Sequence, residues 1–206
     1  MMKNVKIVFA SGNKYKIEEF GAILRRYIPE IEVVSMKDVD IFDDIVEDGM
    51  TFEENAMIKA RAVSKHGYIG VADDSGIAVD ALGGAPGIYS ARYAGEHGND
   101  KKNNQKLLAE MQGIDNRSGA FVCAIACSFP ENMANEDFCV RGECRGVILN
   151  EEKGTGGFGY DPLFYVEEFD KTFGELSAEE KNRISHRAVA TELFANRFCI
   201  ELDNKE

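Results

Sequence analysis

Hydrophobic and polar positions change their period along the chain, and these changes predict strands that alternate with helices. Residues 4–10, NVKIVFA, are a short apolar run typical of a buried strand. Apolar residues then recur at helical spacing from Ile17 to Ile28, and Pro29 ends that run. Further strands are expected at residues 31–35, 68–72, 119–129 and 138–149, and further helices at residues 51–65, 99–111 and 177–199.

Two short polar patterns mark the starts of helices. Thr51 with Glu54, and Ser177 with Glu180, have the spacing of a capping box, in which a hydroxyl and a carboxylate satisfy backbone N–H groups at the first turn. Each pair is therefore expected to begin a helix.

The order of the elements indicates the fold class. Strands followed by helices, and then a hairpin with a polar turn at residues 131–136, predict an α/β fold with a mixed central sheet flanked by helices. The acidic residues 37–50 and the Gly-rich residues 81–89 and 154–162 are expected to be loops. No repeat divides the 206 residues, so a single domain over 1–206 is expected.

Composition and charge limit the classes of partner. With 44% apolar residues the chain can build a core, and its formal net charge is −12. Binding to a nucleic acid polymer needs a basic face, so this charge argues against DNA or RNA as a partner. The sequence shows no membrane span or cleavable leader, and its five cysteines include no CxxC pair. These features predict reduced thiols in a cytoplasmic protein that does not bind a membrane.

The segment SGNKYK, residues 11–16, follows the first strand and begins a helix. Free backbone N–H groups at the positive end of a helix dipole could bind phosphate there, with Lys14 and Lys16 adding charge. The alternative is an ordinary Asn or Ser cap followed by solvated lysines. The segment is not a Walker loop, because G-x-x-x-x-G-K-[ST] is absent.

The segment GTGGFG, residues 154–159, matches the spacing G-x-G-x-x-G without the context of a dinucleotide-binding motif. That motif opens a helix, whereas Pro162 disfavours helix at Asp161. The functional interpretation is a loop that presents Phe158 and Tyr160 for stacking on a nucleobase. The alternative places both rings in the core.

The segment ISHR, residues 184–187, places His186 and Arg187 directly after Ser185. Both side chains offer hydrogen-bond donors, which could read a carbonyl oxygen such as the 6-oxygen of hypoxanthine or xanthine. The alternative is a helix N-cap at Ser185 followed by two exposed side chains.

Asp73 and Asp74 lie side by side where an apolar strand ends, in VADDSG. If the strand continues, their side chains point to opposite faces and need not share a role. A carboxylate that faces a polyphosphate needs a cation between them, so a cleft-facing Asp implies Mg²⁺, with Glu47 as a candidate second ligand. A structural turn built on the pair is the alternative.

Five segments together carry a resemblance to a known family. In chain order they are SGNKYK, EDGMTFEENAMIKA, ADDSGIAVDALGGAPGIYSARY, GTGGFGYDP and EEKNRISHR. The chain resembles, nearly end to end, the inosine triphosphate pyrophosphatase family, enzymes that remove non-canonical purine nucleotides. The resemblance implies a mixed sheet in two lobes with a deep cleft between them, Mg²⁺ dependence and a homodimer. It also implies hydrolysis of purine nucleoside triphosphates (ITP, dITP, XTP) to monophosphate and pyrophosphate.

The resemblance also implies roles for individual residues. Asp74 would be the general base and a metal ligand, with Glu47 as a second ligand and Asp73 as a support from the other face. The residues implied to bind the phosphates and adjoining substrate are Ser11, Gly12, Asn13, Lys14, Tyr15, Lys16, Lys59 and Ser75. The residues implied to hold the base and sugar are Phe158, Gly159, Tyr160, Asp161, Lys181, His186 and Arg187.

Two rival functions are considered, one of them another enzyme and the other a binding protein. A general metal-dependent nucleotide phosphohydrolase would have a different base preference and release orthophosphate. A nucleotide-binding regulator would have no turnover. The acids Asp74 and Glu47 argue against a regulator, since a pure sensor needs less acid near phosphate.

Overall fold

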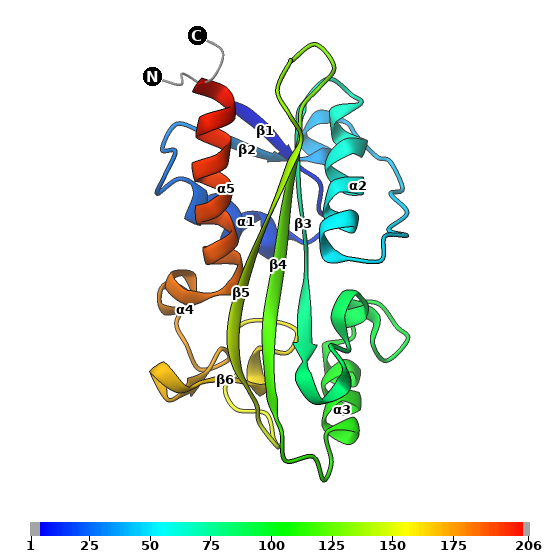
Figure 1. Cartoon of the computed structure of the whole chain (residues 1–206), viewed down its shortest axis with the longest axis vertical. Helices are drawn as coiled ribbons and strands as arrows, with labels where there is room; N and C mark the ends of the chain where they lie inside the picture. Colours follow the sequence, from blue (N-terminus) through cyan, green and yellow to red (C-terminus); the bar gives the residue numbers. More distant parts are fainter. Residues whose placement is uncertain (1–4, 204–206) are drawn as a thin grey trace. The chain divides into compact units, whose positions relative to one another are not determined.

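The computed structural model describes residues 5–203, whose strands form one seven-stranded sheet (Figure 1). The strands are β1 (Lys6–Phe9), β2 (Glu32–Ser35), β3 (Ile69–Val79), β4 (Ser118–Ser128), β5 (Phe138–Ile148), β6 (Phe164–Val166) and β7 (Lys171–Thr172). Their order in the sheet is β2-β1-β3-β4-β5-β6-β7. β1 is parallel to β2 and β3, whereas β6 is antiparallel to β5 and β7. The predicted mixed sheet is confirmed, and β4 and β5 are neighbours as the predicted hairpin requires.

The expected helices are present with altered ends. They are α1 (Lys14–Leu24), α2 (Phe52–Ser64), α3 (Asp100–Glu110), α4 (Ala178–Ile184) and α5 (His186–Asp203). The helical region expected at residues 177–199 is broken at Ser185, whose backbone is extended. The expected loops contain short 3₁₀ helices at Met36–Val39, Asp80–Leu82 and Gly87–Arg92. Asn4 of the first predicted strand lies outside the described residues.

The two predicted capping boxes form to different extents. At α4, the Ser177 side chain and the Glu180 carboxylate satisfy each other's backbone amides. At α2, the Thr51 hydroxyl accepts from the Glu54 amide at 3.1 Å. The Glu54 carboxylate instead accepts from the Met50 amide, at 2.6 Å. This contact ties the end of the acidic loop to the first turn of α2.

The chain forms two compact units. Unit 1 comprises Met1–Asp74, Cys123–Gly142 and Arg187–Glu206, and unit 2 comprises Ser75–Val122 and Glu143–His186. The long strands β3, β4 and β5 each contribute residues to both units. A single domain over 1–206 stays a prediction, as does a cleft between two lobes.

The core of unit 1 fixes which way each residue of β3 faces. Val71 packs in one cluster with Phe20 of α1 and Phe194 of α5. The neighbouring Gly70 faces α2 so closely that a Cβ there would lie 2.1 Å from the Ala60 carbonyl oxygen. Figure 1 shows α2 and α5 on opposite sides of β3. Because side chains alternate along a strand, position 73 faces α1 and α5 and position 74 faces α2.

Unit 2 has a core of its own. Ile77 at the end of β3 packs in one cluster with Leu107 of α3 and with several aromatic rings. The Phe121 ring lies 4.6 Å from the Phe164 ring and stacks on Phe173 at 5.6 Å. The Gly-rich loop at residues 154–162 is anchored beside this aromatic cluster, since its Tyr160 and the following Leu163 belong to it.

Two further expectations concern cysteine and membranes. All five cysteines are free thiols. No helix of the described residues is both long enough and apolar enough to cross a bilayer.

Candidate functional site

Asp73 lies at the centre of a buried group of charges in unit 1. Its side chain is 2% exposed, and its Oδ2 lies 2.9 Å from Nη2 of Arg187 and 3.2 Å from Nζ of Lys16. Arg187 is completely buried, and its Nη1 binds the Glu19 carboxylate. Since Lys16 and Glu19 belong to α1 and Arg187 to α5, the group joins both helices to β3.

The charges of this group stabilise one another. Burial opposes ionisation of Asp73, but the cations Lys16, Arg187 and Lys59 outweigh it, so the pKa of the Asp73 carboxyl lies well below its usual value. Burial also opposes the charge of Arg187, but Glu19 and Asp73 raise the pKa of the guanidinium. The carboxylate and the guanidinium therefore both stay charged at neutral pH.

Asp74 lies on the opposite face of β3, against α2. Its Oδ1 is 3.6 Å from Nζ of Lys59, and its Oδ2 accepts a hydrogen bond from Nδ2 of Asn55 at 3.3 Å. Lys59 Nζ also binds Oε2 of Glu47 at 2.7 Å. The ammonium of Lys59 thus lies beside two carboxylates, both of which are predicted metal ligands. The predicted opposite orientation of Asp73 and Asp74 is confirmed.

The pKa values of Asp74 and Lys59 follow from this arrangement. Burial raises the pKa of the Asp74 carboxyl, and Lys59 and Lys16 only partly offset that rise. Burial opposes the charge of Lys59, but Asp74 and Glu47 outweigh it and raise the pKa of the ammonium. Asp74 is therefore a stronger base than an ordinary aspartate, beside a fixed positive charge.

The donor set around Lys59 fits Mg²⁺ held jointly with substrate phosphate. Mg²⁺ is commonly bound by one or two carboxylates, with waters and phosphate oxygens completing its octahedron. Asp74 and Glu47 converge on one ammonium and would be these two carboxylates. Within residues 5–203, no group of three or more His, Cys, Asp or Glu side chains could hold a metal alone.

The segment at residues 11–16 combines an ordinary helix cap with a half-buried lysine. Asn13 Oδ1 accepts from the amides of Tyr15 and Lys16, at 3.0 Å and 3.4 Å, and the Asn13 amide donates to the Ser11 hydroxyl. The capping alternative therefore describes Asn13. It does not describe Lys16, because its ammonium binds the buried Asp73 instead of being solvated.

A pocket of about 620 Å³ borders the same segment. Lys14, whose side chain is 85% exposed and pairs with Glu18, lies at this pocket with Ser11 and Gly12. Its other lining residues are Ile17, Glu18, Val33, Ser35, Met36, Lys37, Asp38, Ile41, Phe42 and Asp43. Three of the predicted phosphate-binding residues therefore share one accessible hollow of unit 1.

In unit 2, Asp161 organises the Gly-rich loop. Its carboxylate binds Nζ of Lys181 at 2.7 Å and accepts from the Phe158 amide at 2.9 Å. A Cβ at Gly157, where φ is +74°, would lie 2.0 Å from Asp161 Oδ2, so only glycine fits there. Nζ of Lys181 lies 4.8 Å from the centre of the Phe158 ring. Three predicted base-site residues, Phe158, Asp161 and Lys181, are thus in direct contact.

Tyr160 and His186 belong to the core of unit 2. Each is 4% exposed. The Tyr160 hydroxyl donates to the Ser90 carbonyl at 2.9 Å, and the His186 ring stacks on Phe121 at 4.8 Å. The alternative that placed both loop rings in the core therefore holds for Tyr160. It does not hold for Phe158, which is only half-buried.

The alternative that left His186 and Arg187 exposed is wrong, because both are buried. The two residues also fall in different units, since the division lies between them. Base recognition by Arg187 stays a prediction, while its contacts in unit 1 are with carboxylates. Ser75, also half-buried, follows Asp74 in β3 and begins unit 2.

Sequence reasoning missed polar residues that hold the predicted ones. Asn55 binds Asp74, and in unit 2 two α3 residues hold Gly159: Oδ2 of Asp100 accepts from its amide at 2.7 Å, and Asn104 donates to its carbonyl at 3.2 Å. Asp100 and Asn104 are four residues apart, as are Asn55 and Lys59. Polar pairs at that spacing share a helix face, and this signal could have found them.

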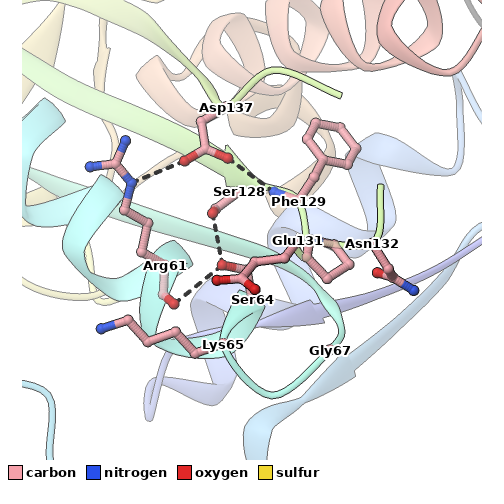
Figure 2. A pocket seen from close by; sticks show the side chains of 10 residues that line it. Arg61, Ser64, Lys65, Gly67, Ser128, Phe129, Glu131, Asn132 and Asp137 are labelled. Atoms are coloured by element: carbon pink, nitrogen blue, oxygen red, sulfur yellow. Dashed lines mark hydrogen bonds and ion pairs between the residues drawn. The ribbon is translucent and has the colours of Figure 1, made fainter. Parts of the chain in front are cut away.

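A second pocket of unit 1 is lined by none of the predicted site residues. Figure 2 shows this pocket. It measures about 500 Å³. Its lining comprises Arg61, Ser64, Lys65, Gly67, Ser128, Phe129, Pro130, Glu131, Asn132 and Asp137. Figure 2 shows Arg61 bound to Asp137, at 3.0 Å, and the hydroxyls of Ser64 and Ser128 in contact at 2.8 Å. These contacts stabilise the end of α2 against the turn between β4 and β5.

Comparison with known proteins places the chain in a family. The model of the Ham1 family matches residues 7–197. A dITP/XTP pyrophosphatase of Bacillus licheniformis is 49% identical over 190 residues, covering 90% of this chain and 93% of that protein. One from Clostridium perfringens is 45% identical over 196 residues, covering 91% and 94%. The solved Ham1 protein of Staphylococcus aureus has a TM-score of 0.84 at 41% identity, and the match covers 98% of this chain and 100% of that protein. The chain therefore belongs to the Ham1 family, which confirms the resemblance and the α/β fold.

Replacing Asp73 by Asn should destabilise the protein in a pH-dependent way. The loss of a buried partner of Arg187 and Lys16 should cost about 3–5 kcal/mol of unfolding free energy at pH 7. Because the folded state depresses the pKa of Asp73, its stabilisation is present above the ordinary carboxyl pKa and fades as pH falls below about 4. Urea unfolding of both proteins from pH 7 to pH 3 should show the difference narrowing in acid.

The partly exposed Arg61–Asp137 pair provides the control (Figure 2). Asp137→Asn should cost no more than about 1 kcal/mol at pH 7. Equal losses for the two variants would show that the Asp73 group does not stabilise the fold in the way described.

Proposed function

We propose that this protein hydrolyses non-canonical purine nucleoside triphosphates, such as ITP, dITP and XTP, to the monophosphate and pyrophosphate. The arrangement of Asp74, Lys59 and Glu47 carries the proposal, because it places a basic carboxylate, a second carboxylate and a fixed cation together in unit 1. The names of the relatives from Bacillus licheniformis and Clostridium perfringens support the same substrates.

In the proposed reaction, water attacks a phosphorus atom and the bond between the α- and β-phosphoryl groups breaks. Asp74 orients this water and accepts its proton, a role favoured by the raised pKa of its carboxyl. Mg²⁺ held by Asp74 and Glu47 would neutralise phosphate charge and polarise the reacting group. Lys16 and Lys59 lie beside Asp73 and Asp74 and would offset charge that gathers on the phosphate oxygens.

The base is proposed to bind in unit 2. The half-buried Phe158 ring offers a stacking surface, and Lys181, bound to Asp161, offers a donor beside it. A donor can pair with the 6-oxygen of hypoxanthine or xanthine but meets another donor in the 6-amino group of adenine. His186 remains a proposed member of this base site, while base recognition by Arg187, which belongs to unit 1, stays a separate prediction.

The proposal also includes the finer expectations drawn from the family resemblance. These are Mg²⁺ dependence, a homodimer, a cytoplasmic location and purine nucleotides as partners in place of a nucleic acid polymer. The net charge of −12 supports the last of these. A deep cleft that receives the nucleotide belongs to the same proposal.

A panel of nucleoside triphosphates with product identification tests the function. With Mg²⁺ present, ITP, dITP and XTP should yield pyrophosphate, and their kcat/KM should exceed that of ATP by about 10²–10³. Release of orthophosphate would instead favour a general phosphohydrolase. Absence of turnover with tight nucleotide binding would favour a regulator.

Asp74→Asn should lower kcat by about 10²–10⁴, because it removes the charge that water and metal both need. The variant should remain folded. Burial raises the pKa of Asp74, so its ionised form costs stability at neutral pH, and the neutral Asn removes that cost. Kinetics on dITP together with urea unfolding would measure both effects. Near-normal kcat in the folded variant would contradict the assignment of Asp74.

Phe158→Ala should raise KM for ITP and XTP by about 5–150-fold, because a stacked base loses about 1–3 kcal/mol. Its effect on kcat should be smaller, since the ring is not proposed to contact the reacting phosphate. Tyr165→Phe, which removes a hydroxyl bound to Asp170 in the same unit, is the control and should leave KM unchanged. An unchanged KM in Phe158→Ala would move the base away from this ring.

A further inference from the structure

We propose that Asn55 is a positioning residue for the reaction, which orients the Asp74 carboxylate and fixes the segment that carries Glu47. The inference rests on the proposed function of Asp74. Asn55 belongs to the first turn of α2 and is 2% exposed. A buried amide at this position is not needed to cap the helix, because Thr51 performs that role.

Both ends of the Asn55 side chain have a defined partner. Oδ1 accepts a hydrogen bond from the Gly49 amide at 2.9 Å, and Nδ2 donates to Oδ2 of Asp74 at 3.3 Å. A backbone N–H can be satisfied only by the oxygen of the amide, and a carboxylate only by its nitrogen. The two partners therefore allow one orientation of the Asn55 side chain.

The contact to Asp74 fixes the rotation of its carboxylate. Asn55 holds Oδ2, while Lys59, one helical turn further along α2, lies 3.6 Å from Oδ1. The plane of the carboxylate is thus set by two neighbouring positions on one rigid helix. A general base must point a lone pair at the attacking water, and a misplacement of about 1 Å can cost about 10² in rate.

The contact to Gly49 fixes the backbone near Glu47. Gly49 lies so close to α2 that a Cβ there would be 2.7 Å from Asn55 Oδ1 and 2.8 Å from Cβ of Glu54. Glu47 is two residues before this point, and its carboxylate binds Lys59. The Asn55 side chain thus links both candidate metal-binding carboxylates, those of Asp74 and Glu47, to the same turn of α2.

Glu54 supplies a matched control. It is exposed, it belongs to the same first turn of α2, and its carboxylate accepts from the Met50 amide at 2.6 Å. Removing the Glu54 carboxylate should loosen the same loop without removing the donor to Asp74. A purely structural role for Asn55 would make the two residues equivalent.

Three variants separate the contacts of Asn55. Asn55→Ala removes both contacts, whereas Asn55→Asp keeps the acceptor for Gly49 and loses the donor to Asp74. Glu54→Ala leaves Asn55 intact. We expect Asn55→Ala to lower kcat on dITP about 10–100-fold, with a smaller change in KM. Asn55→Asp should lower kcat at least as much, while amide exchange at Gly49 stays protected. Glu54→Ala should keep kcat within about twofold, in line with a surface substitution. Circular dichroism and thermal unfolding of each variant identify any that fails to fold.

The outcomes distinguish this proposal from the proposed function. Unchanged kcat in Asn55→Ala, or equal kcat losses in Asn55→Ala and Glu54→Ala, would overturn the positioning role while the wild type still releases pyrophosphate. Faster exchange at Gly49 in Asn55→Asp than in the wild type would also overturn it, since the acceptor would then not hold the loop. A wild-type protein that releases no pyrophosphate from any triphosphate would instead overturn the proposed function.

Discussion

A buried carboxylate that must remain charged is the constraint on which the arrangement of unit 1 depends. Asp73 has almost no exposed surface, so its negative charge persists only because Arg187 and Lys16 contact it directly. These contacts hold α1 and α5 against β3 at a defined register. Side chains alternate along a strand, so fixing Asp73 on one face also fixes Asp74 on the other. The buried ion group therefore helps to position a candidate catalytic residue on the opposite face of the strand.

Lys16 and Lys59 each pair with a carboxylate of the protein and are also proposed to meet the phosphates of the substrate. The protein carries an excess of acid, and a triphosphate is itself highly charged, so the field of the whole molecule repels the proposed substrate. Lys59 is kept protonated by Asp74 and Glu47, and Lys16 lies against Asp73. Buried carboxylates thus hold local positive charge in a net negative protein, and the phosphates would meet cations that are already ordered.

The sequence predicted the elements better than the environments of individual side chains. Period and capping signals located the helices and five of the seven strands, because those signals are local. They did not predict the short strands β6 and β7, and they ended the third strand at residue 72, whereas β3 continues to Val79. The motif residues Asp74, Lys59 and Glu47 lie together in the structure, and their joint action in catalysis stays a prediction. Tyr160 is a core residue, however, and Arg187 is completely buried between carboxylates, and neither fact follows from its neighbours in sequence. Asn55 was missed although its four-residue spacing from Lys59 places both on one helix face, because that spacing does not show the contacts with Gly49 and Asp74 that form in the fold.

The path of the chain through the two units has a consequence for how this protein can change over time. Unit 1 consists of three separate segments and unit 2 of two, and β3, β4 and β5 supply residues to both. No contiguous stretch of the gene encodes either unit. Neither can be duplicated, lost or exchanged between proteins as a module, in the way that tandem domains are recombined. A new base preference would have to arise by point substitution around residues proposed to hold the base, such as Phe158, while the shared strands keep the proposed phosphate site intact.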